Sequence, residues 1–187
     1  TYLEARMIRA HGLLRESNDK KFIKSYQKKY NFLNPDFIFL YSGFNMRNNE
    51  IGGILGRSQL KRLNNIVDKR NINHQYFLSK IDSSRYFNNF NMKGSSNYAF
   101  NLILIKKDKY LLKRLKIKLK KNNIEFRQGS AGGGNQLLQP YLENFHFNKK
   151  YKLPVVEHIH SYGFYIGNYP SLTFKDIDFI CKVINSA

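Results

Sequence analysis

The chain lacks the features of a secreted, membrane-embedded or metal-bound protein. Its 187 residues include one cysteine, Cys181, which cannot form an internal disulfide. No run of about 18 apolar residues occurs, so we expect no membrane span. We recognise no signal-peptide pattern in the first residues. These absences predict a reducing, cytoplasmic environment.

Acidic residues are also scarce: 13 Asp and Glu stand against 32 Lys and Arg, giving a net charge of +19. This excess alone suggests a nucleic acid or an acidic surface as partner. The basic residues are densest in Lys106–Lys121, where leucines recur at helical spacing between lysines. Because no zinc-finger, RNP or helix-turn-helix motif accompanies them, we favour a solvated lysine face without specific nucleic-acid binding. A basic nucleic-acid-binding domain is the alternative from another class.

Complete catalytic motifs are missing as well. The histidines form no His-Glu-x-x-His motif, and no Gly-x-Ser-x-Gly elbow or recognisable pair of carboxylates is present. We therefore expect no metal site. His158 and His160, two residues apart, are expected on the same side of a strand.

The pattern of apolar residues predicts an α/β chain whose last part is a small α+β domain. Strands are expected at Tyr98–Ile105, Ile124–Gln128 and Tyr162–Ile166, with a helix over Asp108–Lys121. Thr173 and Asp176 form a capping-box pattern that opens a final helix. From about residue 94 to 187 we expect a largely antiparallel sheet covered by helices.

Residues 1–82 carry a different pattern. A short helix is expected to stop at His11-Gly12, and the aromatic run Phe37–Tyr41 follows later, with Phe37–Leu40 expected to expose apolar surface. A single long helix is predicted from about 49 to 80, capped by Asn48 or Asn49. Its apolar stripe comprises Ile51, Ile54, Leu55, Leu60, Leu63, Ile66 and Val67. Gly52 and Gly53 are unfavourable in a helix and predict close packing against another backbone.

A glycine-rich loop follows the second expected strand. Gly129–Gly134 holds four of the twelve glycines, with Arg127 before it and the amides Asn135, Gln136 and Gln139 after it. This composition predicts a loop that holds a polar, phosphorylated ligand. The loop lacks the Lys of a P-loop and the third glycine of a dinucleotide fingerprint. A flexible surface turn is the alternative.

Four motifs in order carry a resemblance: Met7–Gly12, Gly43–Arg47, Gln59–Leu63 and Gly163–Pro170. Together they resemble the C-terminal half of the DegT/DnrJ family of vitamin-B6-dependent nucleotide-sugar aminotransferases and dehydratases. The stretch Ala131–Tyr141 is similar to the sugar 3-dehydratase branch of that family.

The resemblance implies the C-terminal part of the fold type I PLP-dependent transferase fold. Residues 1–48 would end the large cofactor domain, 49–82 would form the connecting helix, and 83–187 would form the small C-terminal α/β domain. It also implies a homodimer with shared active sites. The Lys or His that acts on the cofactor, PLP or PMP, would lie upstream of Thr1. We therefore expect no catalytic residue in this chain and no activity from it alone.

The resemblance further implies roles for individual residues. Asn45 would reach the cofactor phosphate of the neighbouring subunit, with Arg47 beside it, although Asn45 could equally cap a turn. The residues expected to bind the nucleotide-sugar are Arg127, Gly132, Gly133, Gly134, Asn135 and Gln139. Leu138 departs from the family, whose dehydratases often carry a polar residue there.

The implied function is 3-dehydration of a 4-keto-6-deoxysugar nucleotide in deoxysugar and O-antigen biosynthesis. The alternative within the family is a sugar 4-aminotransferase that takes its amino group from glutamate. A non-catalytic remnant is a further alternative.

Overall fold

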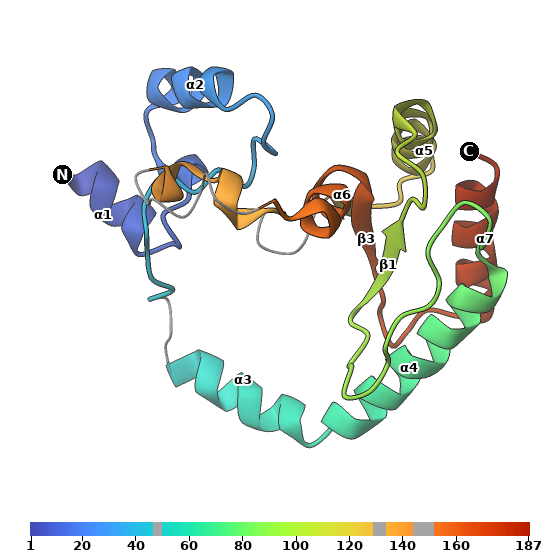
Figure 1. Cartoon of the computed structure of the whole chain (residues 1–187). Helices are drawn as coiled ribbons and strands as arrows, with labels where there is room; N and C mark the ends of the chain where they lie inside the picture. The colour runs from blue at the N-terminus through green and yellow to red at the C-terminus, as the bar shows by residue number, and fades with distance from the viewer. Residues whose placement is uncertain (47–49, 129–133, 144–151) are drawn as a thin grey trace.

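The computed structural model describes residues 1–46, 50–128, 134–143 and 152–187. Two lobes stand apart and are joined along one side by a helical arm (Figure 1). The N-terminal lobe contains residues 1–46 and, packed against them, residues 134–143. The C-terminal lobe contains residues 63–128 and 152–187. No helix in the described ranges is long and apolar enough to cross a membrane.

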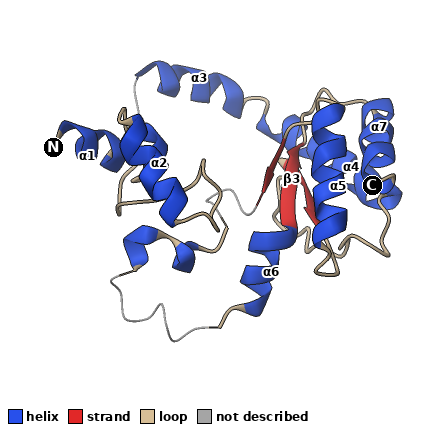
Figure 2. Ribbon diagram, turned by 90° about the horizontal axis from the view of Figure 1, so that it is seen from above, coloured by secondary structure: helices blue, strands red, loops and turns tan. Residues whose placement is uncertain are grey.

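The C-terminal lobe is built on a small antiparallel sheet. Strands β1 (Ala99–Ile103), β2 (Phe126–Gln128) and β3 (Gly163–Gly167) lie in the order β1-β3-β2. Helices α4 (Leu63–Lys80), α5 (Lys109–Lys121) and α7 (Phe174–Asn185) lie on one side of it (Figure 2). The expected antiparallel sheet is confirmed; β1 and β2 are shorter than the apolar runs that predicted them, whereas β3 has the predicted length, displaced by one residue.

Alternation along the strands decides which face the helices cover. Phe100 and Leu102 of β1 and Phe164 and Ile166 of β3 are buried, whereas Asn101 between them is exposed. The Phe77 ring of α4 stacks on Phe100 with centroids 4.6 Å apart. The helices complete this core with Leu111, Leu115, Leu119, Ile177, Ile180, Cys181 and Ile184.

The two helix starts predicted in the C-terminal lobe, at Asp108 and Thr173, are confirmed in atomic detail. Asp108 accepts a hydrogen bond from the backbone N–H of Leu111 at 2.8 Å, which caps α5. Thr173 and Asp176 form the reciprocal capping box of α7. These ends depend only on neighbouring residues, which explains why the sequence predicts them well.

The strand expected to carry His158 and His160 was wrong. Both residues lie in helix α6 (Pro154–Tyr162), which begins with a proline at its first position. Residues two apart on a helix point to different sides. His158 Nε2 accordingly lies 2.6 Å from the carbonyl oxygen of Leu104, whereas His160 faces the N-terminal lobe.

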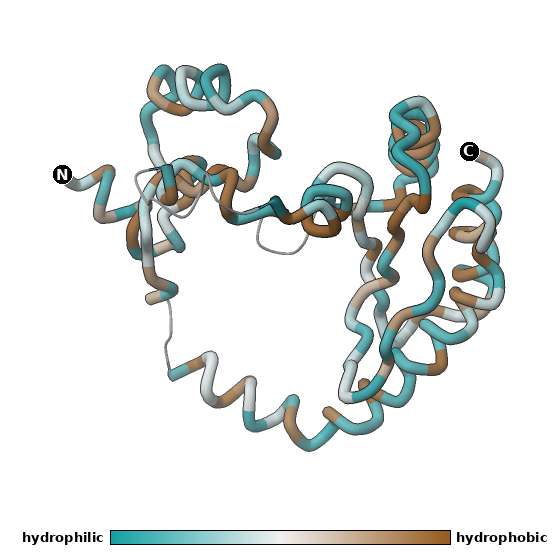
Figure 3. Tube along the Cα trace, in the orientation of Figure 1, coloured by the Kyte–Doolittle hydropathy of each residue, from teal (hydrophilic) through white to brown (hydrophobic). Residues whose placement is uncertain are grey.

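The long helix predicted over residues 49–80 is two helices, α3 (Glu50–Leu60) and α4, separated by a turn at Lys61-Arg62. Its apolar stripe is not buried on α3, where Ile51, Ile54, Leu55 and Leu60 are 59% to 69% exposed. Figure 3 shows the hydrophobic positions of α3, in brown, on the arm between the two lobes. A Cβ added at Gly53 would meet nothing within 4 Å. The close backbone contact predicted at Gly53 is thus absent from the described part of the chain. Asn48 and Asn49, the proposed caps, lie outside the described residues.

The N-terminal lobe has a small core of its own. It contains α1 (Tyr2–Ile8), a 3-10 turn at Leu14–Glu16 and α2 (Lys20–Lys29), a helix that we did not predict. Leu14, Tyr30, Leu33 and Ile38 are buried together. The expectation that Phe37–Leu40 are exposed was therefore wrong: Ile38 is fully buried and the other three are half-buried.

His74 of α4 is completely buried among aromatic rings. The rings of Phe77, Phe90 and Phe100 lie 6.2 to 6.4 Å from it, and neither of its ring nitrogens has a hydrogen-bond partner among the described residues. Burial lowers the pKa of His74 below its usual 6.5. The folded protein thus holds His74 neutral, and the unfolded chain binds a proton that the folded state excludes.

We expect the free energy of unfolding to fall as the pH drops below 6.5, by up to about 1.4 kcal/mol per pH unit for one such histidine. Urea unfolding at pH 7, 6 and 5 measures this dependence. His74→Phe should remove His74's share of the pH slope. An unchanged slope in that variant would contradict the assignment.

Candidate functional site

Two of the family-like motifs, Met7–Gly12 and the described part of Gly43–Arg47, residues 43–46, are in direct contact through their backbones. The Phe44 N–H donates to the Ile8 carbonyl at 2.8 Å, and the His11 N–H donates to the Phe44 carbonyl at 2.9 Å. Ala10 and Asn45 form an antiparallel bridge beside them. The two motifs therefore form one structural unit, here called the motif turn.

Two glycines make the motif turn possible. Gly12 has a φ of +76°, and a Cβ on it would lie 1.8 Å from the carbonyl oxygen of Tyr41. A Cβ on Gly43 would lie 2.4 Å from the Gly12 nitrogen. Only glycine at both positions allows the backbones to approach this closely.

The motif turn presents Asn45 to solvent. Its side chain is exposed and has no hydrogen-bond partner in the ranges that the structure describes. The amide therefore has donor capacity for a ligand outside this chain. Arg47, the other residue expected at the cofactor, lies outside the described residues.

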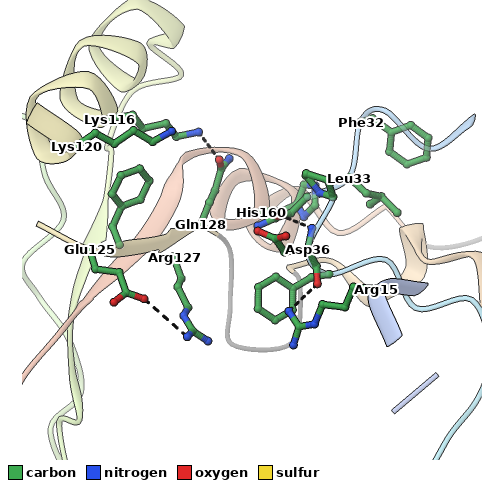
Figure 4. Close-up of a pocket in the computed structure, with 14 residues that line it drawn as sticks. Arg15, Phe32, Leu33, Asp36, Lys116, Lys120, Glu125, Arg127, Gln128 and His160 are labelled. Atoms are coloured by element: carbon green, nitrogen blue, oxygen red, sulfur yellow. Dashed lines mark hydrogen bonds and ion pairs between the residues drawn. The ribbon is translucent and has the colours of Figure 1, made fainter. Parts of the chain in front are cut away.

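A cavity of about 690 Å³, here called the interlobe cavity, lies between the two lobes (Figure 4). One wall comes from Arg15 and residues 32–37 of the N-terminal lobe. The other comes from α5, β2 and His160. Its charged lining residues are Arg15, Asp36, Lys116, Lys120, Glu125 and Arg127. Four cations against two carboxylates favour an anionic ligand.

The cations of the interlobe cavity are not equally available. Arg15 donates to the Asp36 carbonyl at 2.9 Å and its guanidinium stacks over the Phe37 ring. Lys116 donates to the Gln128 side chain, and burial, with repulsion from Lys120, lowers its pKa. Arg127 is exposed on β2, and its contact with Glu125 is long at 3.8 Å (Figure 4). Arg127 is therefore the best placed to exchange a weak ion pair for a ligand phosphate.

His160 contacts Gly134 and Asn135 at the end of the glycine-rich loop and holds them in place. The sequence did not reveal this role. Its Nδ1 accepts a hydrogen bond from the backbone N–H of Asn135 at 3.1 Å. Gly134 has a φ of +84°, and a Cβ there would lie 2.1 Å from that Nδ1. Burial lowers the pKa of His160, which favours the neutral ring that this hydrogen bond requires.

The two amides expected to bind substrate hold the loop in place. The Asn135 side chain accepts from the Leu137 N–H at 3.1 Å and caps the 3-10 turn Gln136–Leu138. Gln139 is fully buried: its Oε1 accepts from the Phe39 N–H at 2.9 Å and its Nε2 donates to the Phe37 carbonyl at 3.1 Å. A second 3-10 turn, Pro140–Leu142, follows.

The structure thus brings Arg127 to the interlobe cavity, whereas Asn135 and Gln139 act on the backbone around it. Gly132 and Gly133 lie outside the described residues. Direct contacts of these predicted residues with a substrate stay predictions. Within the described residues no cluster of three or more potential metal ligands occurs.

Comparison with known proteins agrees with the resemblance read from the motifs. The DegT/DnrJ/EryC1/StrS aminotransferase family matches residues 2–185. GDP-4-keto-6-deoxy-D-mannose 3-dehydratase from Escherichia coli O55:H7 (strain CB9615 / EPEC) is 28% identical over 178 residues, which are 95% of this chain and 45% of that protein. The chain spans less than half the length of the curated relatives it matches.

Solved structures show the same relationship. The E coli GDP-4-keto-6-deoxy-D-mannose-3-dehydratase with bound hydrated PLP has a TM-score of 0.59 at 26% identity and covers 95% of this chain and 45% of its own. A variant of this dehydratase type with bound GDP-perosamine has a TM-score of 0.57 at 25% identity, with 98% and 47% covered. The predicted fold class, the C-terminal part of the PLP-dependent transferase fold, is confirmed.

Proposed function

This chain belongs to the DegT/DnrJ/EryC1/StrS aminotransferase family, and we propose that it serves the PLP- or PMP-dependent 3-dehydration of a 4-keto-6-deoxysugar nucleotide. The support is its similarity to two 3-dehydratases at 28% identity. Such a reaction belongs to cytoplasmic deoxysugar and O-antigen biosynthesis. Because the family also contains aminotransferases, a sugar 4-aminotransferase with glutamate as donor is the second candidate.

The residues of this chain would bind and orient the cofactor and the substrate, and would not carry out the chemical step themselves. When bound, the cofactor supplies an electron-withdrawing ring that stabilises charge as the C3 hydroxyl leaves. The motif turn fits the phosphate of that cofactor through Asn45, whose exposed amide is a neutral donor next to the closely packed backbones at Gly12 and Gly43. We place Arg47 beside it as a second donor.

Asn45 is not among the residues that line the interlobe cavity. The phosphate contact and the proposed substrate cavity therefore do not converge within one chain. This separation is the observation that carries our proposal of a homodimer, in which Asn45 of one subunit serves the cofactor held by the other.

The interlobe cavity would take the anionic part of the nucleotide-sugar. Arg127 would contact the diphosphate, and the glycine-rich loop would lie over the substrate with Gly132 and Gly133 close to it. Asn135 and Gln139 would support that loop through the contacts already described. We keep the division into 1–48, 49–82 and 83–187 as part of this proposal, with residues 134–143 packed on the N-terminal lobe.

Asn45→Ala tests the phosphate contact. Loss of one neutral donor, worth about 1 kcal/mol, should weaken binding of pyridoxamine phosphate about fivefold. Equilibrium dialysis measures this binding without requiring activity, on a protein in which residues 1–187 follow the large cofactor domain that the family resemblance implies. Asn88→Ala, at an exposed loop position outside the motif turn, is the matched control. Equal retention in Asn45→Ala and the wild type would remove Asn45 from the cofactor site.

A further inference from the structure

The C-terminal lobe carries a dense group of cations on helix α5, at its periphery (Figure 1). Residues 106–121 contain nine Lys and Arg and one acidic residue, Asp108, whose carboxylate caps the helix. We propose that the exposed side of α5 binds the surface of an anionic lipid membrane. This side is here called the outer face and consists of Tyr110, Lys113, Arg114, Ile117 and Lys121. The inference adds a partner to the proposed function and does not depend on it.

The helical repeat separates the outer face from the packed side of α5. Leu111, Leu115 and Leu119 are buried in the core of the lobe. The members of the outer face are all exposed and follow one another at spacings of three, four and seven residues. Such spacings place side chains along one side of a helix. Lys106 and Lys107, exposed just before α5, extend the basic surface.

The cations of the outer face are available to a partner. In the described ranges, Lys113, Arg114 and Lys121 form neither an ion pair nor a side-chain hydrogen bond. Lys118, on another side of α5, differs from them, because its amine donates to the carbonyl oxygen and Oγ of Ser186. Like charges that no carboxylate neutralises create a positive potential, which attracts an anionic surface.

Two apolar side chains among these cations favour a membrane over a nucleic acid. Tyr110 is 81% exposed and Ile117 is 55% exposed, and they lie two turns apart on the outer face. Aromatic and aliphatic side chains of such a helix can enter the headgroup region, while the lysine and arginine head groups stay at the lipid phosphates. Nucleic-acid binding by cations alone is directed to phosphates and gives an exposed isoleucine no apolar layer to enter.

The other basic helix, α2, provides an internal comparison. Three of its lysines are exposed: Lys20, Lys24 and Lys28. Its apolar side chains Phe22, Ile23 and Tyr26 are half-buried against the core of the N-terminal lobe. Helix α2 therefore resembles α5 in its cations and lacks the exposed apolar residues beside them. Net charge alone would make the two helices equivalent, whereas our proposal distinguishes them.

Co-sedimentation of the full chain with vesicles tests the assignment at physiological salt. The chain should bind vesicles of equal parts phosphatidylcholine and phosphatidylglycerol, and should not bind pure phosphatidylcholine. The α5 triple variant, Lys113→Gln with Arg114→Gln and Lys121→Gln, should weaken binding roughly a hundredfold, or about fivefold for each cation. The matched α2 triple variant, Lys20→Gln with Lys24→Gln and Lys28→Gln, removes the same charge and should stay within about threefold of the wild type.

The apolar contact has its own readouts. Ile117→Gln keeps the charge and should weaken vesicle binding about fivefold, because it removes apolar area from the interface. The chain contains no Trp, so Tyr110→Trp introduces a single fluorescent reporter on the outer face. Its emission should shift to the blue when the mixed vesicles are added. Tyr2→Trp, at a position of α1 that is 71% exposed, is the control and should not shift.

Equal losses in the α2 and α5 triple variants would overturn the proposal, because net charge would then account for the binding. Failure of the wild type to bind the mixed vesicles, or an unshifted emission in Tyr110→Trp, would also overturn it. A DNA duplex is the remaining probe. Tighter binding to DNA than to the mixed vesicles, lost in the α5 triple variant and unchanged in Ile117→Gln, would assign the outer face to nucleic acid instead. Far-UV circular dichroism of each variant verifies that the helices are retained.

Discussion

Gly12→Ala is expected to unfold the N-terminal lobe locally, with a loss of about 3 kcal/mol or more. Alanine at a φ of +76° is strained, and its Cβ would overlap the Tyr41 carbonyl oxygen at 1.8 Å. Relief requires the chain at Tyr41 to move, which breaks the hydrogen bond from the Leu40 N–H to the Gly12 carbonyl. Hydrogen exchange at the Leu14 and Leu40 amides measures this opening directly.

Gly56→Ala provides the matched control. Gly56 lies within α3, and a Cβ there would meet nothing within 4 Å. The same substitution should therefore be neutral or stabilise the helix by up to about 1 kcal/mol. Unchanged protection of Leu14 and Leu40 in Gly12→Ala would show that the backbones of the motif turn can separate without loss of structure.

Asn168→Ala is expected to destabilise the C-terminal lobe by about 3 kcal/mol. The fully buried Asn168 amide donates to the carbonyls of Arg70 and Asn97, both at 2.8 Å, and accepts from Asn73 at 3.3 Å. It thereby connects α4, the segment before β1 and the end of β3. Alanine would leave these buried polar groups without their partner. Urea unfolding followed by circular dichroism measures the change.

Asn64→Ala is the control for this substitution, because Asn64 is exposed on α4 and should change stability by no more than about 0.5 kcal/mol. A change as small in Asn168→Ala would mean that water replaces the amide and that the buried network is not required.

The predicted site residues fall into two groups: one lines a cavity, and the other forms hydrogen bonds to backbone. Arg127 was expected at a ligand, and the structure places it in the interlobe cavity because its strand is an edge of the sheet. Asn135 and Gln139 looked equally suited to a ligand. Their partners, Leu137 for one and Phe37 and Phe39 for the other, show that each holds backbone. The partners of Gln139 lie about 100 residues away along the chain, so composition around the loop could not predict them.

Helix α2 and the exposed apolar stripe of α3 also show that the sequence alone does not predict tertiary contacts. The lysine-rich α2 packs one face, partly buried, against Leu14, Leu33 and Ile38, which lie outside it. The stripe on α3 has a pattern typical of burial but finds no partner in the described part of this chain. The spacing of apolar residues predicts which side chains are suited to burial, whereas the tertiary structure determines which segment covers them.

The sequence by itself determined the features that depend on neighbours along the chain. These are the caps of α5 and α7, the alternation that buries one face of β1 and β3, the glycine-dependent motifs and, through them, the family. Tertiary structure alone decided which amides hold backbone, that His160 anchors the loop after Gly134, and that Arg127 lines the interlobe cavity. The physical reason is that caps and alternation are local, whereas hydrogen-bond partners and cavity walls come from segments that only folding brings together.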